Sequence, residues 1–488
     1  MKQKSICWRT LRLIRWTTSV SLSALLVACG GGGGGASDPP PPPPVTATRV
    51  QDSRSFSPPI EASLPALDDS WASTDRWTGV LEGAAYRIEV PRNWNGSLVV
   101  WARGYWIAPT LYIENPPLRR HFLQNGYAWA VSSYTRNYYD VNVGIEDSNR
   151  LVSQFQAIAA ARGRVLAAPR RVYIGGWSMG GHVAAAAVED EVLRDARTPV
   201  RYDGALALCP SLGEPDWYDY MAAYQLAMQQ LLGFAAEGYP SQTYAQNVAT
   251  MKATVVDAVN RKDLSQPAIA KLYALMEQLS GGARPFYREG WQDLYHHNIL
   301  FGLMNGDPTL EGILAVPAMD TRSVEYRFSA TLDADARQFN DSIRRLTRGV
   351  DSNPRQQRGL RWLPLTTGQL IAPVMSLQTL GDLTVPIDLQ VRYRQRVLAQ
   401  GQGPRLTQRL IRDVGHCSFT IAEMAKAFDD LVAQAERGVR PAGDDLLDTA
   451  RWRGAQAGCA HTDNRVSPED RADPVKRAGI QAAYPACR

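Results

Sequence analysis

Apolar positions along this chain alternate between short continuous runs and longer stretches with helical spacing. Two runs rich in β-branched and aromatic residues, at residues 85–90 and 97–102, predict strands. Residues 127–134 and 171–174 predict two more, and between them residues 146–162 place apolar side chains on one face of a helix. Strand, helix and strand in this order are typical of a βαβ unit in a parallel sheet.

The same alternation resumes near the end of the chain, after a long interruption. Further strands are predicted at residues 203–209, 372–378 and 405–412, and a helix at residues 421–438. Within the interruption, residues 216–234, 242–259 and 266–279 have helical spacing, with Met and Tyr prominent. We interpret this insertion as a helical cap over the strand ends, where α/β sheets bind their ligands. A separate domain with its own function is the alternative.

The pattern therefore predicts the α/β fold class: a mostly parallel sheet flanked by helices, with a large helical cap inserted after the strand ending at Cys209. A length of 488 residues, 45% of them hydrophobic, suffices for one buried core and an insertion. The predicted segments are a first part of the core at residues 71–212, the cap at 213–370, a second part of the core at 371–440 and a tail at 441–488.

Composition separates the first 60 residues from the rest. An apolar stretch at residues 17–28 follows a basic segment, is too short to span a bilayer, and ends with small residues before Cys29. These features predict a lipoprotein signal at residues 1–28 and acylation of Cys29, with an ordinary secretory signal as the alternative. Glycine and proline runs at residues 29–60 then form a tether to the membrane. Gly30 after the cysteine favours the outer membrane of a Gram-negative cell.

The distribution of charge argues against one class of partner. Five of the 53 basic residues lie in the first 15 positions, and without them 48 basic residues balance 48 acidic ones. This balance implies no basic surface for nucleic acid. The expected partners are a membrane, through the lipid, and a small-molecule or polymeric substrate.

Export makes four cysteines interpretable: Cys209, Cys417, Cys459 and Cys487. An even number in an oxidising compartment predicts two disulfides, for which three pairings are possible. Their spacing matches no zinc-ligand pattern, so we expect no metal ion. We expect no cofactor either.

The strongest chemical signal is Gly176-Trp177-Ser178-Met179-Gly180, which follows the strand at residues 171–174 and precedes an Ala-rich helical run at 183–188. A strained strand-to-helix turn of this kind exposes the Ser178 oxygen, and the two glycines remove side chains that would clash. The helix N-terminus then directs free N–H groups toward a developing oxyanion. The alternative is a glycine-rich turn with an incidental serine.

A serine hydroxyl needs a general base oriented by a carboxylate, and in this arrangement the order is Ser, acid, His. Among six histidines, His416 follows the last predicted strand, in Asp413-Val414-Gly415-His416-Cys417. Asp382, in the turn Gly381-Asp382-Leu383-Thr384-Val385-Pro386 after the preceding strand, is the predicted acid. Asp388 is its local competitor, and Asp413 is too close to His416 in sequence.

Two backbone N–H groups are expected to stabilise an oxyanion. The amide of Met179 follows the nucleophile, and the amide of Tyr105 belongs to the loop after the strand at residues 97–102. Each such donor is typically worth about 3 kcal/mol of transition-state stabilisation.

With elbow, acid turn and histidine loop of matching type and order, residues 84–438 resemble the α/β-hydrolase superfamily. Gly104-Tyr105 together with Trp177-Ser178-Met179-Gly180 is also similar to bacterial polyester hydrolases and cutinase-like enzymes, which lack a cap of this size. This likeness implies ester chemistry but no polymer substrate.

His416-Cys417 is similar to the tannase and feruloyl esterase group, in which cysteines beside the serine and the histidine are bridged. Because Trp177 precedes Ser178 here, that bridge cannot form. The resemblance suggests instead a Cys209–Cys417 disulfide that braces the histidine loop, with Cys459–Cys487 closing the tail.

The expected function is that of a carboxylic-ester hydrolase that forms an acyl-enzyme, with an apolar or aromatic acyl group favoured by the Met, Leu, Tyr and Trp residues of the cap. An exported aminopeptidase of the same fold is one alternative, and it needs an acidic pair in the cap. Glu214, Asp216 and Asp219 are candidates for that pair. A non-catalytic binding lipoprotein is the other alternative, against which the complete triad argues.

Overall fold

The computed structural model describes residues 64–67, 73–106, 111–234, 242–303, 319–349, 360–467, 469–470 and 472–487. They all belong to one unit, residues 44–488. The predicted signal at residues 1–28, the tether at 29–60 and the candidate lipidation site Cys29 lie outside the described residues. Within the ranges described, no helix combines the length and the apolar character needed to cross a bilayer.

An eight-stranded sheet of order β1-β2-β4-β3-β5-β6-β7-β8 forms the centre of the fold. Its strands are β1 (Thr74–Leu81), β2 (Ala84–Pro91), β3 (Ser97–Ala102), β4 (Ala128–Ser132), β5 (Arg171–Trp177), β6 (Gly204–Leu208), β7 (Val374–Thr379) and β8 (Leu406–Ile411). The pairs β1–β2 and β2–β4 are antiparallel, and every pair from β4 to β8 is parallel. The predicted α/β class and the mostly parallel sheet are confirmed.

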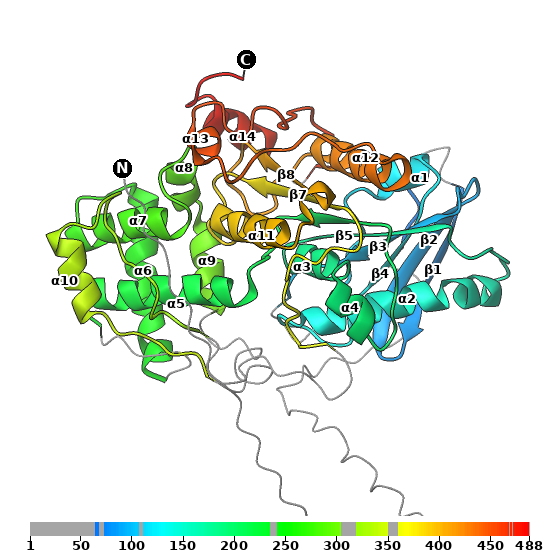
Figure 1. Cartoon of the computed structure of the whole chain (residues 1–488), viewed down its shortest axis with the longest axis horizontal. Helices are drawn as coiled ribbons and strands as arrows, with labels where there is room; N and C mark the ends of the chain where they lie inside the picture. The colour runs from blue at the N-terminus through cyan, green and yellow to red at the C-terminus, as the bar shows by residue number, and fades with distance from the viewer. Residues whose placement is uncertain are drawn as a thin grey trace, which may run out of the picture. The chain divides into compact units, whose positions relative to one another are not determined.

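Helices cover both faces of this sheet (Figure 1). On one face lie α2 (Val141–Ala161), α3 (Met179–Ala186) and α11 (Ile387–Ala399), and on the other α1 (Arg119–Gln124) and α12 (Ile421–Arg437). Strand β3 is buried throughout: Val100 packs in the cluster on the α2 side, and Trp101 in the cluster on the α12 side. Burial on both faces is why the parallel strands appear in the sequence as continuous apolar runs.

The helix boundaries follow from local capping. In α12 the Thr420 side chain accepts from the Glu423 amide while Glu423 bonds back to Thr420, and the helix ends at Gly438 with φ 68°. Helix α2 starts before the predicted residue 146 because the Asp140 side chain accepts from the Val143 amide, 3.1 Å away, and caps the helix there. Strand β1 was not predicted.

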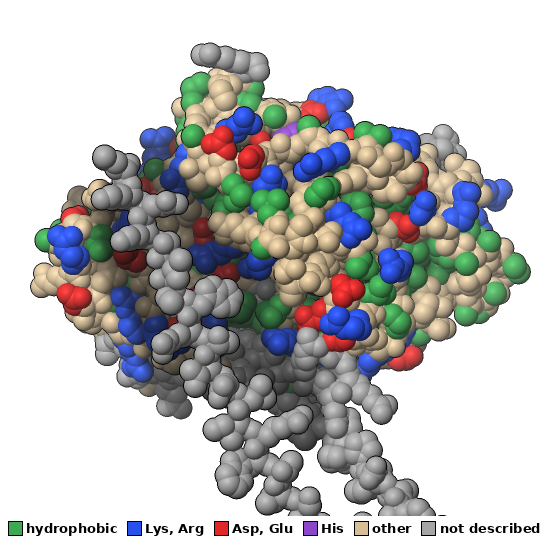
Figure 2. Space-filling model, in the orientation of Figure 1, with side chains coloured by type: hydrophobic (Ala, Val, Ile, Leu, Met, Phe, Trp, Pro, Cys, Tyr) green, Lys and Arg blue, Asp and Glu red, His purple; other side chains and the backbone are tan. Residues whose placement is uncertain are grey.

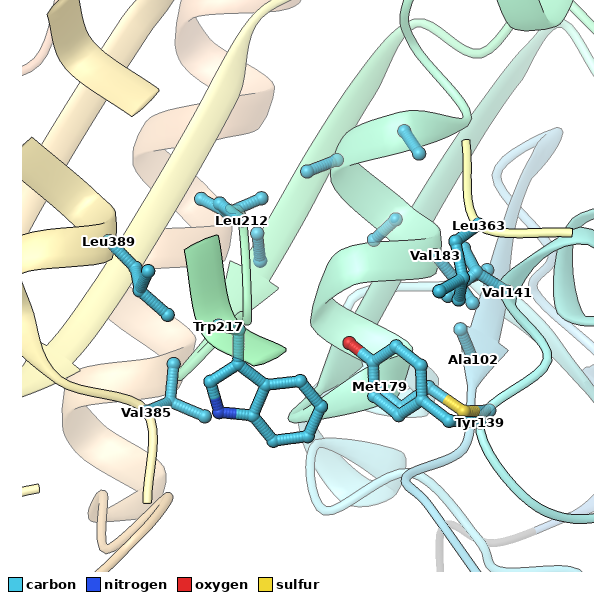
Figure 3. Packing of buried hydrophobic residues seen from close by; sticks show 14 of the residues in the cluster. Ala102, Tyr139, Val141, Met179, Val183, Leu212, Trp217, Leu363, Val385 and Leu389 are labelled. Carbon is cyan, nitrogen blue, oxygen red and sulfur yellow. The ribbon is translucent and has the colours of Figure 1, made fainter. Parts of the chain in front are cut away.

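The insertion between β6 and β7 is helical, as predicted. Its helices are α5 (Glu214–Leu231), α6 (Gln242–Arg261), α7 (Pro267–Leu279), α8 (Tyr287–Trp291), α9 (Leu294–Leu303) and α10 (Ala334–Ser342). Most of them form a layer beside the sheet, drawn in green and yellow-green in Figure 1. The first turn of α5 reaches the core, where Trp217 lies between Val385 and Tyr139 (Figure 3). The rings of Trp217 and Tyr139 have centroids 4.9 Å apart.

Two short helices, α13 (Thr449–Arg453) and α14 (Pro474–Gln481), belong to the C-terminal tail. The tail contains the Cys459–Cys487 disulfide, with the two Cα atoms 5.3 Å apart. Another short helix, α4 (Asp190–Asp195), follows α3. The face shown in Figure 2 carries Lys and Arg side chains interspersed with Asp and Glu, so this face shows no extended surface of one sign.

Candidate active site

Ser178 stands alone between the end of β5 and the start of α3. Its backbone has φ 55° and ψ −124°, a conformation that costs a non-glycine residue free energy and recurs at functional sites. A Cβ atom at Gly176 would lie 2.5 Å from the Ala102 carbonyl oxygen, and one at Gly180 would lie 2.0 Å from it. Both positions therefore require glycine, and the motif is what lets the serine approach the end of β3.

The structure brings the three residues of the predicted triad into one hydrogen-bonded chain. His416 Nε2 lies 2.9 Å from Ser178 Oγ, and His416 Nδ1 lies 2.7 Å from Asp382 Oδ2. A carboxylate only accepts, so Nδ1 carries the proton and donates it to Asp382. Nε2 is then free to accept the serine hydroxyl, which is the tautomer that a general base needs.

Asp382 is held in the acid turn, residues 381–386, by bonds to both carboxylate oxygens. Its Oδ1 accepts from the amides of Thr384 at 2.9 Å and Val385 at 3.0 Å. Its Oδ2 accepts from Gln378 Nε2 at 3.2 Å in addition to His416. The carboxylate, fully buried, is therefore fixed in one rotamer.

The charge on this carboxylate is maintained despite its burial. Burial raises the pKa of Asp382, whereas the charge of the protonated His416 imidazole and its hydrogen bond lower it. The Val385 amide, and His296 when it is protonated, act in the same direction as His416, and together these effects outweigh burial, so the pKa lies below its ordinary value.

The competing carboxylates have other partners. Asp388 accepts from Arg392 Nε at 2.6 Å on the surface of α11. Asp413 accepts from the Ser418 hydroxyl at 2.8 Å and from the Val414 amide at 2.6 Å. Asp413 therefore shapes the histidine loop, residues 412–420, instead of contacting the imidazole.

A disulfide also holds the histidine loop. Cys209, directly after β6, is bonded to Cys417, the neighbour of His416, with the Cα atoms 5.3 Å apart. The pairing is the one that the family resemblance suggested. Both sulfurs lie near the His416 ring, but as disulfide sulfurs they offer no thiolate to a metal ion.

The two predicted oxyanion donors flank the serine. Met179 is the first residue of α3, and Tyr105 lines the same cavity as Ser178. Arg103 Nη1 donates to the Gly104 carbonyl at 2.8 Å, and that carbonyl shares its peptide plane with the Tyr105 N–H. Because the two groups of a trans peptide point in opposite directions, Arg103 fixes the direction of the Tyr105 amide.

Sequence reasoning missed Glu114, which anchors this oxyanion loop, residues 103–105. Its Oε1 accepts from Trp177 Nε1 at 2.6 Å and from the Gly104 amide at 3.3 Å. Its Oε2 accepts from the Tyr112 hydroxyl at 2.7 Å. Glu114 lies between β3 and α1 in a segment without periodicity, so no signal in the sequence marked it.

A cavity of about 570 Å³ opens over the serine. It is lined by Gly104, Tyr105, Trp106, Tyr112, Tyr139, Trp177, Ser178, Trp217, Tyr295, Asn298, Ile299, Thr384, His416, Cys417 and Ser418. Seven of these residues are Trp or Tyr. The described lining includes no Asp, Glu, Lys or Arg, and His416 is its one histidine. An uncharged, partly aromatic group matches this surface.

A hydrogen bond with His182 holds Tyr139 in position in the cavity lining. Its hydroxyl lies 3.0 Å from His182 Nδ1 on α3 and bonds the Ser211 hydroxyl. His182 Nε2 lies 3.3 Å from the Pro364 carbonyl oxygen, so Nε2 carries the proton and Nδ1 accepts from Tyr139. The hydroxyl is thereby held away from the cavity.

Two of the three candidates for an aminopeptidase's acidic pair, Asp216 and Asp219, are not among the described residues that line the cavity. Asp216 pairs with Arg396 at 3.4 Å, and Asp219 pairs with Arg348 at 2.6 Å. The Glu214 side chain lies outside the described residues.

The sheet order and the serine at a strained strand-to-helix turn give this protein the α/β-hydrolase fold, with a candidate active site in the cavity above the serine. No protein-family model matches the chain. In sequence it is similar to an o-phthalyl amidase from Xanthobacter agilis, with 24% identity over 78% of this chain and 92% of that protein.

Among solved structures, the chain is similar to feruloyl esterase B from Aspergillus oryzae, with 11% identity and a TM-score of 0.46 over 81% of this chain and 86% of that one. An esterase from Pyrococcus furiosus aligns with 12% identity and a TM-score of 0.38 over 81% of this chain and 100% of the other. The strand order of the sheet and the turn at Ser178 establish the fold independently of these structures.

Proposed function

We propose that the protein hydrolyses carboxylic esters through an acyl-enzyme on Ser178. The observation that carries the proposal is the hydrogen-bonded chain from Ser178 through His416 to Asp382, with distances of 2.9 and 2.7 Å, beside a cavity large enough for a small ester. Ligand binding alone does not require a serine in a strained conformation beside an oriented imidazole, whereas nucleophilic catalysis does, so this geometry favours an enzyme.

In the proposed reaction, Ser178 Oγ attacks the ester carbonyl while His416 Nε2 accepts the hydroxyl proton. Asp382 stabilises the imidazolium that forms, and the amides of Met179 and Tyr105 donate to the developing oxyanion. His416 then protonates the departing alcohol. A water molecule, deprotonated by the same nitrogen, releases the acid and restores the serine.

The cavity lining supports an uncharged substrate with an aromatic or apolar portion. Tyr295 lies roughly parallel to His416, with 6.1 Å between ring centroids and 17° between the planes, so an acyl or alkoxy group beside the imidazole meets an aromatic face. The volume of about 570 Å³ suits a small-molecule ester or the end of a polymeric one.

Amide hydrolysis is the second candidate, and the similarity to the o-phthalyl amidase favours it. The same serine, base and oxyanion donors serve an amide if His416 protonates the leaving amine. An aminopeptidase has less support, because Asp216 and Asp219 are engaged by arginines away from the cavity.

We further propose that the enzyme is a lipoprotein of the cell envelope, anchored through acylated Cys29. The basic and apolar segments before Cys29 support this address, and two disulfides are in keeping with an oxidising compartment. Metabolic labelling with a palmitate analogue should mark the wild type and spare Cys29→Ala. Equal labelling of both would contradict the anchor.

The activity is tested with matched pairs of p-nitrophenyl esters and p-nitroanilides that share acetyl, butyryl or benzoyl groups. We expect ester turnover to exceed anilide turnover for each pair, with benzoyl accepted. Turnover of the anilides without turnover of the esters would contradict the proposed esterase activity and support amide hydrolysis instead. A lack of turnover on both series, together with no labelling by a fluorophosphonate probe, would favour the binding protein.

A further inference from the structure

Helix α9 of the cap presents two different surfaces to the site. Tyr295, Asn298 and Ile299 face the cavity. His296, between them in sequence, is fully buried on the other side, against the acid turn and the histidine loop. The proposed mechanism assigns no role to this imidazole.

Both ring nitrogens of His296 have partners. Nε2 lies 2.8 Å from the Val414 carbonyl oxygen, and Nδ1 lies 2.9 Å from Thr384 Oγ1. A carbonyl only accepts, so Nε2 carries the proton and Nδ1 accepts the Thr384 hydroxyl. Burial lowers the pKa of His296, which favours this neutral ring.

The two partners belong to the two segments that carry the acid and the base. Val414 lies two residues before His416, and Thr384 lies two residues after Asp382. The amide of Thr384 donates to Asp382 Oδ1 at 2.9 Å, while His296 Nδ1 is 3.6 Å from that oxygen, beyond hydrogen-bond distance. His296 therefore acts on the carboxylate through Thr384.

We infer that His296 is a positioning residue, which ties the acid turn to the histidine loop so that the Asp382–His416 hydrogen bond keeps its length and direction. The cap, through this side chain, is part of the catalytic arrangement as well as a wall of the cavity. The inference rests on the proposed triad mechanism.

The next residue provides a matched control. His297 is also fully buried on α9, but its Nε2 lies 2.7 Å from the Trp291 carbonyl oxygen within the cap. Replacement of either histidine by alanine removes one buried imidazole from the same helix. Only the replacement of His296 removes bonds to the acid turn and the histidine loop.

The test measures kcat and KM for p-nitrophenyl butyrate, the rate of fluorophosphonate labelling, and the melting temperature of each variant. His296→Ala should lower kcat and the labelling rate by about 10- to 100-fold, with KM within about threefold, because the loss is one of alignment. His297→Ala should keep kcat within about threefold of the wild-type value, even if its melting temperature falls as far as that of His296→Ala. His296→Gln, which keeps an N–H near the position of Nε2, should recover part of kcat.

A second variant avoids emptying a large buried site. Thr384→Val keeps the amide that bonds Asp382 and removes only the hydroxyl, so kcat should fall; with His296→Ala the losses should be less than multiplicative. If His296→Ala and Thr384→Val both label and turn over ester at the wild-type rate, the role of His296 is refuted while the proposed function stands. The same holds if His297→Ala loses as much kcat as His296→Ala. A wild-type protein that neither labels nor turns over ester would instead overturn the proposed function, and the inference with it.

Discussion

Gly180→Ala is the substitution whose effect can be worked out most directly from the structure. An added Cβ would lie 2.0 Å from the Ala102 carbonyl oxygen and 2.7 Å from that of Arg103, whereas Cβ contacts below 3.0 Å are essentially never seen. Both obstacles are backbone atoms, so relief requires a backbone shift of about 1 Å at the end of β3. That backbone leads directly into the oxyanion loop with the Tyr105 amide.

A displacement of about 1 Å in a catalytic group typically costs about 100-fold in rate, or about 2.7 kcal/mol of transition-state stabilisation. We therefore expect kcat/KM for p-nitrophenyl butyrate to fall about 100-fold in Gly180→Ala. Gly479→Ala in α14 is the control, because nothing lies within 4 Å of the added Cβ; it should keep wild-type activity. A folded Gly180→Ala enzyme with kcat/KM within about threefold of the wild type would refute the steric reasoning.

Three further outcomes are expected. The Cys209–Cys417 disulfide closes a loop of 208 residues and should stabilise the fold by about 5 kcal/mol in the chain-entropy account, against about 3.5 kcal/mol for the Cys459–Cys487 disulfide, which closes 28 residues. When both cysteines of one pair are replaced by serine, thermal melts should show the larger loss of stability for the Cys209–Cys417 pair. Only that variant should also lose kcat. Burial lowers the pKa of His297 from 6.5 to about 4, so the stability linked to its neutral form is complete above pH 6.5 and is lost as the pH falls toward 4; urea unfolding of His297→Asn should show a shallower pH dependence in that window, and an unchanged slope would contradict the assignment. Glu114→Leu should lower the melting temperature and reduce kcat about tenfold, since the Trp177 N–H, the Gly104 amide and the Tyr112 hydroxyl all lose this acceptor; wild-type values of both would refute the role of Glu114.

Much of the candidate site could be predicted from the sequence because its residues lie in short local motifs. The elbow at Ser178, the turn at Asp382 and the loop at His416 each combine a strand end with glycines or prolines that fix the backbone. Their side chains meet because parallel strands place their carboxyl ends at one edge of the sheet. The order along the chain was therefore enough to assign the three positions.

What the sequence did not reveal depends on tertiary contacts. Strand β1 is half-exposed and includes Asp75 and Arg76, so its apolar pattern is too weak to mark a strand. His296 falls within the predicted cap, residues 213–370, but its role could not be predicted because its contacts depend on how α9 packs against two loops that are distant in sequence. The role of Glu114 depends on its hydrogen bond with the Trp177 ring, which is distant from it in sequence.

The central claim is that Ser178 is the nucleophile, and the most direct measurement is intact-mass analysis with peptide mapping after fluorophosphonate treatment, beside ester turnover by Ser178→Ala. We expect one adduct per wild-type chain, located on Ser178, no adduct in Ser178→Ala, and a loss of kcat of at least about 1000-fold in that variant. An adduct on another residue, or ester turnover by Ser178→Ala at the wild-type rate, would contradict the account.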